Sequence, residues 1–406
     1  MSQRAPYDIQ SQAFFDDPYP TLHRIREEDP VHWFEPLGIW LVTRYDHADM
    51  MVRDDRRFLN HRARELIRVM MPTLAGEELT AMAQMWSELV WFRDPPDHAR
   101  LRQFMNKGFT PQAIEGLRPA VRAIAREALA AAREKGEEID IVEDLADPIA
   151  LRTITSLFGV PPDDRPTFRG WITTLFKGAG GAAIAEDVTN RIKEHTSAML
   201  NYIAALAERR RADRGDDVIS RFWADEGAPS REDIVLQSYQ VIVAGYRTSM
   251  NQIANTIWTL LRHPAELERL RDDPRRMKGA IEEALRYEPS VVVTNRLAAE
   301  DVEIGGKRIK KGELVFPILP AAICDPLAFP DPDRFDITRT GPRHLSFSMG
   351  HHYCIGAPLV RVEVEEALAA LLEIPRWEPG SGPCLLGDYN LSDRGPKTLP
   401  MRLLAS

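Results

Sequence analysis

RHLSFSMGHHYCIGAPLVRVEVEEALAALLE, residues 343–373, decides the fold, because it joins a glycine-punctuated loop to a helix that opens at Pro358. Proline is favoured at the first helical position, where the N–H that it lacks would have no partner. Cys354 therefore lies just before a helix N-terminus, whose unpaired N–H groups favour a thiolate over a thiol. Gly350 and Gly356 bracket the cysteine and permit close approach to a flat cofactor. The loop thus predicts a thiolate ligand.

Two other interpretations of this loop need no organic cofactor. A lone cysteine is often a small, buried hydrophobic residue. A zinc ion is the second alternative, although adjacent histidines are awkwardly spaced for one tetrahedral metal. The zinc ligands would then be His344, His351, His352 and Cys354.

The bulk composition is that of an ordinary globular chain. Its 406 residues are 44% hydrophobic and carry a formal net charge of -9, which argues against nucleic acid as a partner. Cys324, Cys354 and Cys384 are too far apart for a disulfide framework or a CxxC site, so we expect a cytoplasmic location. We expect no membrane anchor, because no signal peptide and no apolar run of ~20 residues is evident.

Helical periodicity dominates the chain, so we expect a mainly α fold. After Ser290 the composition changes to short strands with a hairpin signal at Gly305-Gly306, which predicts a small β-rich lobe. No repeat or flexible linker divides the chain, so residues 1–406 are expected to form a single domain. Glycines at 176–187 indicate either a mobile connector or a lid hinge. The predicted helices are 111–135, 144–158, 187–214, 231–262, 264–272, 277–287 and 358–372.

The ligand loop resembles that of the cytochrome P450 family, Phe-Gly-x-Gly-x-His-x-Cys-x-Gly. The matching residues are Phe347, Gly350, His352, Cys354 and Gly356, while Ser348 stands where the pattern has glycine. The resemblance runs from about residue 18 to 403. It implies the P450 fold, a helical prism with a β-rich lobe, and haem b with the Cys354 thiolate on its iron.

Two further motifs carry the resemblance. Glu283 and Arg286 match the family's Glu-x-x-Arg pair, which the resemblance places inside the core with Arg334 of the segment PDRF as the third member. The same pair can equally be a solvated surface salt bridge of little value. The resemblance also implies a set of side chains for the two haem propionates, which need cationic or hydrogen-bonding partners. That set is His98, Arg102, Arg296 and His352.

The segment VIVAGYRTSM resembles the family's oxygen-binding helix, Ala-Gly-x-(Asp/Glu)-Thr. Ala244 and Gly245 would leave room for dioxygen, and the Thr248 hydroxyl would hydrogen-bond it. Alternatively, Thr248 bonds back to the carbonyl four residues earlier. Arg247 replaces the family's usual carboxylate, so the usual proton route is in doubt. Either Arg247 anchors an anionic group of the substrate, or it turns away to an acidic neighbour.

The resemblance and helical spacing together suggest which side chains contact the substrate. They are Gln240, Val243, Val292 and Thr294, with Trp171, Leu175 and Phe176 as further pocket residues.

The resemblance implies a monooxygenase that hydroxylates or epoxidises a small to medium organic substrate. Its electrons come from NAD(P)H through a ferredoxin and a ferredoxin reductase, because the chain has no dinucleotide fingerprint or iron–sulfur cysteines. Lys107, Arg343 and Arg361 are candidates for a basic rim that receives the ferredoxin. Alternative functions are oxidative coupling, desaturation, peroxide-driven oxidation and non-catalytic haem binding. The substrate, the position oxidised and the oligomeric state are not predicted.

Overall fold

Helices dominate the computed structural model, which describes residues 7–177, 186–224, 229–387 and 392–404. The prediction of a mainly α fold is therefore confirmed. The expected hinge in the glycine-rich segment falls largely on 178–185, outside the described residues. The α-helices are α1 Gln12–Asp16, α2 Tyr19–Glu28, α3 Tyr45–Arg53, α4 Ala63–Met70, α5 Gly76–Ser87, α6 Asp97–Gly108, α7 Pro111–Lys135, α8 Asp147–Leu157, α9 Arg165–Lys177, α10 Glu186–Ala212, α11 Val218–Trp223, α12 Arg231–Arg262, α13 Pro264–Asp272, α14 Met277–Tyr287, α15 Leu319–Ile323 and α16 Ala357–Leu372.

Capping residues and prolines fix the ends of the long helices. The Ser230 side chain accepts from the Asp233 amide before α12, and the Asp233 carboxylate accepts from the Ser230 amide, which completes a capping box. The Thr110 side chain caps α7 by accepting from the Ala113 amide, with Pro111 at the first position. The predicted bounds of α7, α12, α13 and α14 are confirmed. α8 starts later than predicted, because a π-helical turn, Ile141–Ala146, precedes it.

A five-stranded sheet forms the β-rich lobe and has the order β1-β2-β8-β5-β3. β2 and β8 are parallel, and the other neighbours are antiparallel. The predicted hairpin is confirmed, since β6 and β7 pair across Gly305 and Gly306. The lobe also recruits strands from the first 60 residues, which the sequence change after Ser290 does not indicate. The strands are β1 Val31–Phe34, β2 Ile39–Val42, β3 Phe58–Leu59, β4 Glu138–Asp140, β5 Arg296–Ala298, β6 Val302–Ile304, β7 Lys307–Ile309, β8 Leu314–Pro317, β9 Arg376–Pro379, β10 Leu385–Leu386, β11 Pro396–Thr398 and β12 Pro400–Leu404.

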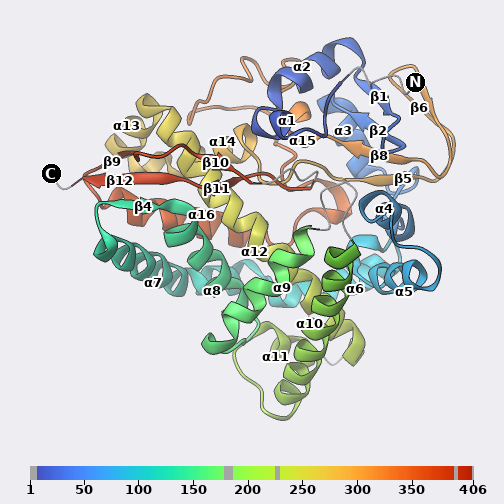
Figure 1. Cartoon of the computed structure of the whole chain (residues 1–406), viewed down its shortest axis with the longest axis horizontal. Coiled ribbons are helices and arrows are strands. Elements are labelled where there is room, and N and C mark those ends of the chain that lie inside the picture. The colour runs from blue at the N-terminus through green and yellow to red at the C-terminus, as the bar shows by residue number, and fades with distance from the viewer. Residues whose placement is uncertain (1–6, 178–185, 225–228, 388–391, 405–406) are drawn as a thin grey trace.

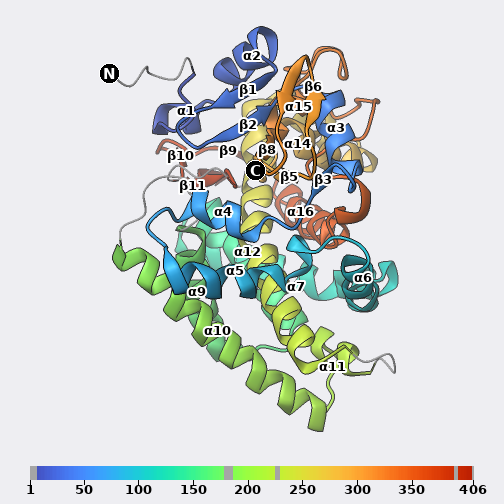
Figure 2. The ribbon, with the colours of Figure 1, turned by 90° about the vertical axis from the view of Figure 1, so that its right-hand side faces the viewer.

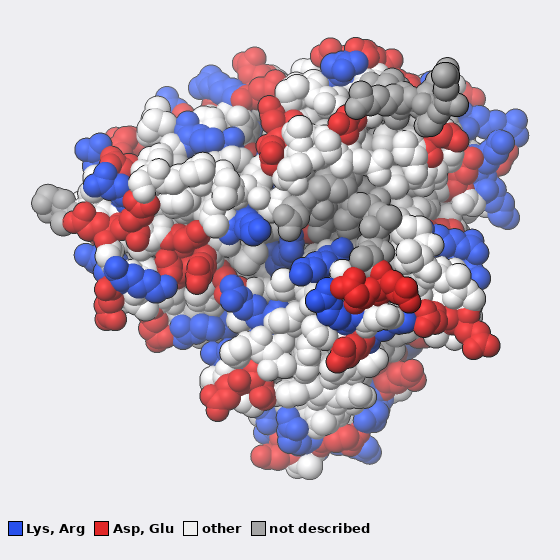
Figure 3. Space-filling view, viewed as in Figure 1, with Lys and Arg blue, Asp and Glu red and all other residues white. Residues whose placement is uncertain are grey.

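α12 is the central element and runs from the β-rich lobe towards α10 and α11 (Figures 1 and 2). It packs against α8, α10 and α16. α16 follows the Cys354 loop directly, so the helix that begins at the ligand loop is one of those packed against α12. Acidic and basic side chains are interspersed across the face in Figure 3. Within the described ranges, no helix is long and apolar enough to cross a membrane.

Candidate cofactor and oxygen site

Two left-handed residues shape the loop that carries Cys354. Gly350 has a φ of +69°, and a Cβ there would lie 2.9 Å from the Val52 carbonyl oxygen. Ser348 has a φ of 59°, a conformation that glycine adopts without steric cost. Its amide donates to the Leu345 carbonyl at 2.7 Å and closes the turn. The serine that replaces the family's glycine therefore follows a glycine-type backbone path at some cost in strain.

The environment of Cys354 acts on its thiol in two opposing ways. Burial raises the pKa of the thiol, whereas the amides of Gly356 and Ala357 and the guanidinium of Arg102 lower it. Burial is the larger effect, so the helix end favours the thiolate but does not by itself produce it. A bound metal ion supplies the missing positive charge, because a coordinating thiol is deprotonated.

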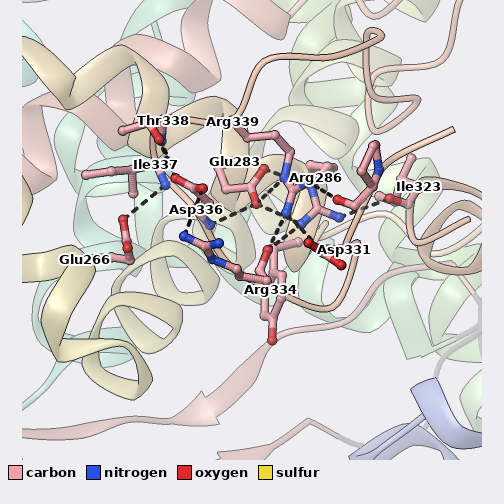
Figure 4. Close-up of polar contacts among 12 residues, drawn as sticks. Glu266, Glu283, Arg286, Ile323, Asp331, Arg334, Asp336, Ile337, Thr338 and Arg339 are labelled. Carbon is pink, nitrogen blue, oxygen red and sulfur yellow. Dashed lines mark hydrogen bonds and ion pairs between the residues drawn. The ribbon is translucent and has the colours of Figure 1, made fainter. Parts of the chain in front are cut away.

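Glu283 and Arg286 of α14 form a bidentate ion pair removed from solvent (Figure 4). Arg286 Nε and Nη2 each donate to Glu283 at 2.8 Å, and both side chains are 3% exposed. Arg339 adds a second guanidinium, donating from Nε to Glu283 Oε1 at 2.9 Å. The pair is therefore buried, not the solvated salt bridge of the alternative interpretation.

The prediction that Arg334 completes this cluster is wrong. Its side chain is 61% exposed and lies 3.4 Å from Asp336, so it has an ion partner at the surface. The chain then turns back towards α14, where the Asp336 amide donates to Glu283 at 3.1 Å and Arg339 enters the cluster. Arg334 contributes only its backbone carbonyl, which accepts from Arg339 Nη2 at 2.6 Å. We call Glu283, Arg286 and Arg339 the balanced cluster, in the sense that both guanidinium groups are paired directly with the Glu283 carboxylate.

Arg361 of α16 is also committed within the chain. Its Nε and Nη2 donate to the Glu282 carboxylate at 2.6 and 2.9 Å, and its guanidinium lies 4.7 Å from the centre of the Phe347 ring. This contact orders the matched aromatic residue of the ligand loop. Arg361 is therefore held in place rather than available on a basic rim. A pocket of ≈ 360 Å³ lies beside these residues, and its lining includes Lys278 and Arg343.

Arg296 and two largely buried histidines, His98 of α6 and His352, lie together. The two imidazole rings lie 4.0 Å apart, and both Nε2 atoms are buried with no hydrogen-bond partner in the described residues. Burial lowers the pKa of His98 to about 4 and that of His352 further, and neighbouring cations add to both effects. Burial likewise lowers the pKa of Arg296 to about 10. Such a group of donors fits an anionic ligand.

Sequence reasoning missed one member of this group, Arg62. It is 7% exposed, and burial and the nearby Arg296 lower its pKa well below the usual range. No motif includes Arg62, so only its burial in the folded chain distinguishes it from a surface arginine. We call Arg62, His98, Arg296 and His352 the cationic cluster. Arg102, also predicted for this set, donates to the Tyr353 carbonyl at 2.7 Å.

The middle of α12 has a partly exposed face although most of the helix is buried. Val243, Ala244 and Thr248 lie on this face. The Thr248 hydroxyl donates to the Ala244 carbonyl at 2.6 Å, which is the back-bonded alternative. Gly245 serves helix packing, because a Cβ there would lie 2.7 Å from Ile154 Cδ1 of α8. The small residue therefore allows the two helices to approach closely.

Arg247 pairs with an acidic neighbour within the chain, which was the alternative to anchoring an anionic group of the substrate. Its Nε donates to Asp393 at 2.6 Å, and the Asp393 side chain is 1% exposed. Asn251 donates to the same carboxylate oxygen at 2.7 Å. The guanidinium also lies 5.3 Å from the centre of the Phe176 ring. Arg247 is thus an anchored residue that joins α12, α9 and the segment before β11.

Comparisons with known proteins identify the family. The family model described as Cytochrome P450 matches residues 82–386 of the chain. The chain belongs to the cytochrome P450 family. It is 36% identical to the cytochrome P450 monooxygenase PikC of Streptomyces venezuelae, covering 96% of this chain and 92% of that protein. It is 34% identical to the 6-deoxyerythronolide B hydroxylase of Saccharopolyspora erythraea, with 98% of each covered.

The P450 fold is equally evident from solved structures. The structure of P450BioI in complex with hexadec-9Z-enoic acid ligated acyl carrier protein matches with a TM-score of 0.88 at 28% identity, covering 97% of this chain and all of that one. The predicted P450 fold is therefore confirmed, and the chain is a P450 monooxygenase.

The residues of this P450 fit haem, the cofactor of its family. The cationic cluster provides donors for two propionates, and Cys354 is followed by amides that favour its thiolate. The zinc alternative is wrong for the described residues, in which no group of His, Cys, Asp and Glu can hold a metal ion. His344 lies 3.2 Å from Glu282, and His351 lies 2.8 Å from Asp55, so the histidines are directed to separate carboxylates.

The predicted substrate residues differ in how the P450 chain uses them. Gln240 is buried, and its Oε1 accepts weakly from the Trp91 amide at 3.4 Å, next to Gln237, which accepts from the Val90 amide at 2.9 Å. Val243 and Thr294 are partly exposed, and Val292 is buried. Thr294 Oγ1 accepts from Arg296 at 3.0 Å. Substrate contact by these residues stays a prediction.

Glu363 of α16 is a further residue that sequence reasoning missed. It is 0% exposed, and burial raises its pKa to about 8. The Ser249 hydroxyl of α12 partly offsets this rise. The signal was present in the sequence, because Leu359 and Ala367 lie four residues to either side and place Glu363 on the apolar face of α16.

Proposed function

We propose that the chain binds haem b through the Cys354 thiolate and oxidises an uncharged, largely apolar organic molecule. The Cys354 loop, set between α16 and the cationic cluster, is the observation that carries this proposal. When bound, haem activates dioxygen with two electrons and two protons, so that one oxygen atom enters the substrate. One relative named above is a hydroxylase by name, the 6-deoxyerythronolide B hydroxylase, and this supports hydroxylation of an organic substrate.

The cofactor proposal is tested by the reduced carbon monoxide spectrum. A thiolate on the iron gives a strongly red-shifted Soret band, and we expect this band from the wild-type protein. Cys354→Ser should lose the shifted band, whereas Cys384→Ser should keep it, because Cys384 lies outside the ligand loop. An unshifted wild-type band would contradict thiolate ligation.

The distal residues position substrate and protons rather than supply a carboxylate beside Thr248. Arg247 Nε is held by Asp393, which reduces its attraction for an anionic substrate group. Val243 and Ala244 offer an apolar surface on the partly exposed face of α12. Thr248 holds a hydroxyl proton at the Ala244 carbonyl, from which rotation about one bond redirects it. The anionic substrate considered from the sequence is therefore not part of this proposal.

The substrate proposal is tested with matched neutral and anionic ligands. Dodecanoic acid and its methyl ester, methyl dodecanoate, serve as the anionic and the neutral form of one apolar probe. Binding of each is measured by the shift in haem spin state. Wild type and Arg247→Met should bind the carboxylate with similar affinity, because Arg247 is already paired. A selective loss of carboxylate binding in Arg247→Met, with the ester unaffected, would restore the anchoring hypothesis.

Glu363 is the proton-holding group that we propose for this site. Its raised pKa keeps an Oε atom protonated at neutral pH, and Ser249, the neighbour of Thr248, interacts with it from α12. An acid with a pKa near the working pH can both release and regain a proton. This acid contacts α12 through Ser249, the residue next to Thr248.

Electrons are proposed to come from NAD(P)H through a ferredoxin reductase and a ferredoxin. Lys278 and Arg343, which line the pocket beside the Cys354 loop, provide positive charge for an acidic ferredoxin together with the exposed Lys107. Lys278→Glu with Arg343→Glu should slow the first electron transfer at low salt and leave substrate binding unchanged. Equal transfer rates for the variant and wild type would contradict this surface.

Product analysis separates monooxygenation from the alternative functions of the same site. Hydroxylated or epoxidised product with NAD(P)H, ferredoxin and reductase supports monooxygenation, whereas coupled or desaturated product supports the alternatives. Product formed with peroxide alone supports peroxide-driven oxidation, and failure to consume dioxygen with any donor supports a haem carrier. We also propose a cytoplasmic protein that functions as one domain over residues 1–406, supported by free thiols at Cys324, Cys354 and Cys384.

A further inference from the structure

Arg62, at the start of α4, is a buried guanidinium that contacts three separate segments. Its Nε donates to the Asn295 side chain, and its Nη1 donates to the Asn60 carbonyl at 2.6 Å and to the Trp91 carbonyl at 3.0 Å. The Phe92 ring centre lies 5.1 Å from the guanidinium. These contacts fix the orientation of the planar guanidinium, and their acceptors use its Nε and Nη1 donors. For Nη2 the described residues provide no hydrogen-bond acceptor.

The charges near Arg62 do not balance. Arg296 is close enough to lower the pKa of Arg62, so two buried guanidinium groups repel each other. Asp94 acts favourably on both arginines, but its oxygens already accept from the Asn60 amide at 2.8 Å and the His61 amide at 3.0 Å. Burying adjacent like charges is unfavourable unless an anion joins them. In the described residues the hydrogen bonds of Arg62 and Arg296 go to neutral acceptors and not to a carboxylate, so the cationic cluster favours an anionic ligand.

We propose that Arg62 is a ligand of the haem propionates, in addition to His98, Arg102, Arg296 and His352. This inference rests on the proposed haem-binding function. The chemical class of the ligand is a carboxylate, bound by Nη2 and the net positive charge of the cluster. Through Trp91 and Asn295, Arg62 also ties the bound propionate to the connection that precedes α6 and to the strand segment before β5. Haem retention and the position of these two connections are thereby coupled.

The test is the rate at which the ferric holoprotein loses haem to an excess of apomyoglobin. Arg62→Gln should lose haem about 10- to 100-fold faster than wild type, the loss expected for a hydrogen bond to a charged group. The matched control is Arg64→Gln, two residues on in α4, where the exposed guanidinium donates to Thr80 at 3.4 Å. Arg64→Gln should retain haem like wild type.

A modified cofactor separates propionate binding from a merely structural role. Reconstitution with the iron porphyrin dimethyl ester blocks both carboxylates, so wild type and Arg62→Gln should then lose cofactor at similar rates. Arg62→Lys keeps the charge but not the fork, and it should recover most of the retention of natural haem. The propionate bending mode in the resonance Raman spectrum should shift in Arg62→Gln and remain in place in Arg64→Gln.

The inference is overturned if Arg62→Gln loses natural haem no faster than Arg64→Gln, or if it loses haem and dimethyl ester equally fast relative to wild type. If Arg62→Gln does not fold, natural haem and the dimethyl ester are compared in Arg62→Lys instead. The propionate bending mode in the resonance Raman spectrum of Arg62→Lys must then differ from that of wild type if Arg62 contacts the carboxylate. Wild type without a thiolate-type carbon monoxide spectrum would instead reject the haem proposal itself. The two failures are therefore distinguishable.

Discussion

The balanced cluster and the cationic cluster both bury arginine side chains, but they differ in where the negative charge comes from. In the balanced cluster, Glu283 accepts from Arg286 and Arg339 at 2.8 and 2.9 Å. In the cationic cluster, Arg62 and Arg296 repel each other, and the Nε2 atoms of two histidines have no partner in the described residues. A cluster whose guanidinium groups are paired directly with a carboxylate of the chain holds the fold, whereas one whose guanidinium groups have no such pairing in the described residues marks a binding site for an anion.

The largest expected effect comes from removing the carboxylate of the balanced cluster. Glu283→Ala leaves two buried guanidinium groups without a partner, which should lower the free energy of unfolding by about 3 to 5 kcal/mol. We expect little soluble protein and no haem incorporation, measured by expression yield and the Soret absorbance. Glu268→Ala, an exposed glutamate on α13, serves as the control. Soluble Glu283→Ala with a normal haem spectrum would show that the cluster is dispensable.

A comparison of two arginines sharpens which residue belongs to the balanced cluster. Arg339→Met should lower the free energy of unfolding by about 2 to 4 kcal/mol, because it removes one of the donors to a buried carboxylate. Arg334→Met should change it by no more than about 0.5 kcal/mol, since that side chain forms an exposed ion pair. Urea unfolding followed by circular dichroism measures both. Equal destabilisation of the two variants would return Arg334 to the cluster.

Glu363 offers a third way of managing a buried charge, which is to keep the proton. Because its pKa is raised from 4.5 to about 8 in the folded chain, its contribution to stability is complete below pH 4.5 and is lost as the pH rises through 8. Glu363→Gln should match wild type near pH 5 and be more stable near pH 8 by roughly 3 to 5 kcal/mol. Urea titrations at four pH values measure this difference.

The control for this pH experiment is Glu365→Gln, because Glu365 lies on the same helix and its side chain is 39% exposed. Its unfolding free energy should follow that of wild type at every pH. If Glu363→Gln also follows the wild-type curve, the carboxyl group is not protonated in the folded chain and cannot be the proton-holding group.

The smallest expected effect concerns the turn that precedes Cys354. Ser348→Gly should raise the free energy of unfolding by about 0.5 to 1 kcal/mol, since glycine adopts a positive φ without strain. Ser348→Ala retains the Cβ and so separates the backbone effect from that of the hydroxyl. Thermal unfolding of the holoprotein measures both variants. A destabilised Ser348→Gly would indicate that the serine side chain has a binding role.

The sequence predicts most of the architecture because local signals mark the helix ends. Ser230 with Asp233 marks the start of α12, and Pro111 marks the start of α7. The Cys354 loop is likewise a local pattern with one strong chemical interpretation. Elements that depend on contacts over long sequence distances are harder to predict from the sequence. The pairing of β1, β2 and β3 with the later strands of the β-rich lobe is an example.

The site residues that sequence reasoning misplaced or missed depend on partners far along the chain. The motif pointed to Arg334, whereas the turn that follows it brings Arg339 to Glu283. Arg62 carries no motif, and its significance depends on Arg296. Asp393, the partner of Arg247, is 146 residues away from it, so the two alternatives for Arg247 could not be separated without the structure.

The contact between Gly245 and Ile154 has a consequence for how relatives of this chain can vary. A methyl group at 245 would meet Ile154 Cδ1 at 2.7 Å, so α8 and α12 share one fixed volume at their crossing. Gly245→Ala should be tolerated with Ile154→Val or Ile154→Ala, and poorly without them. In an alignment of relatives, side-chain size at these two positions should therefore be inversely correlated. The size of the pair would then report how closely α8 and α12 approach in each relative.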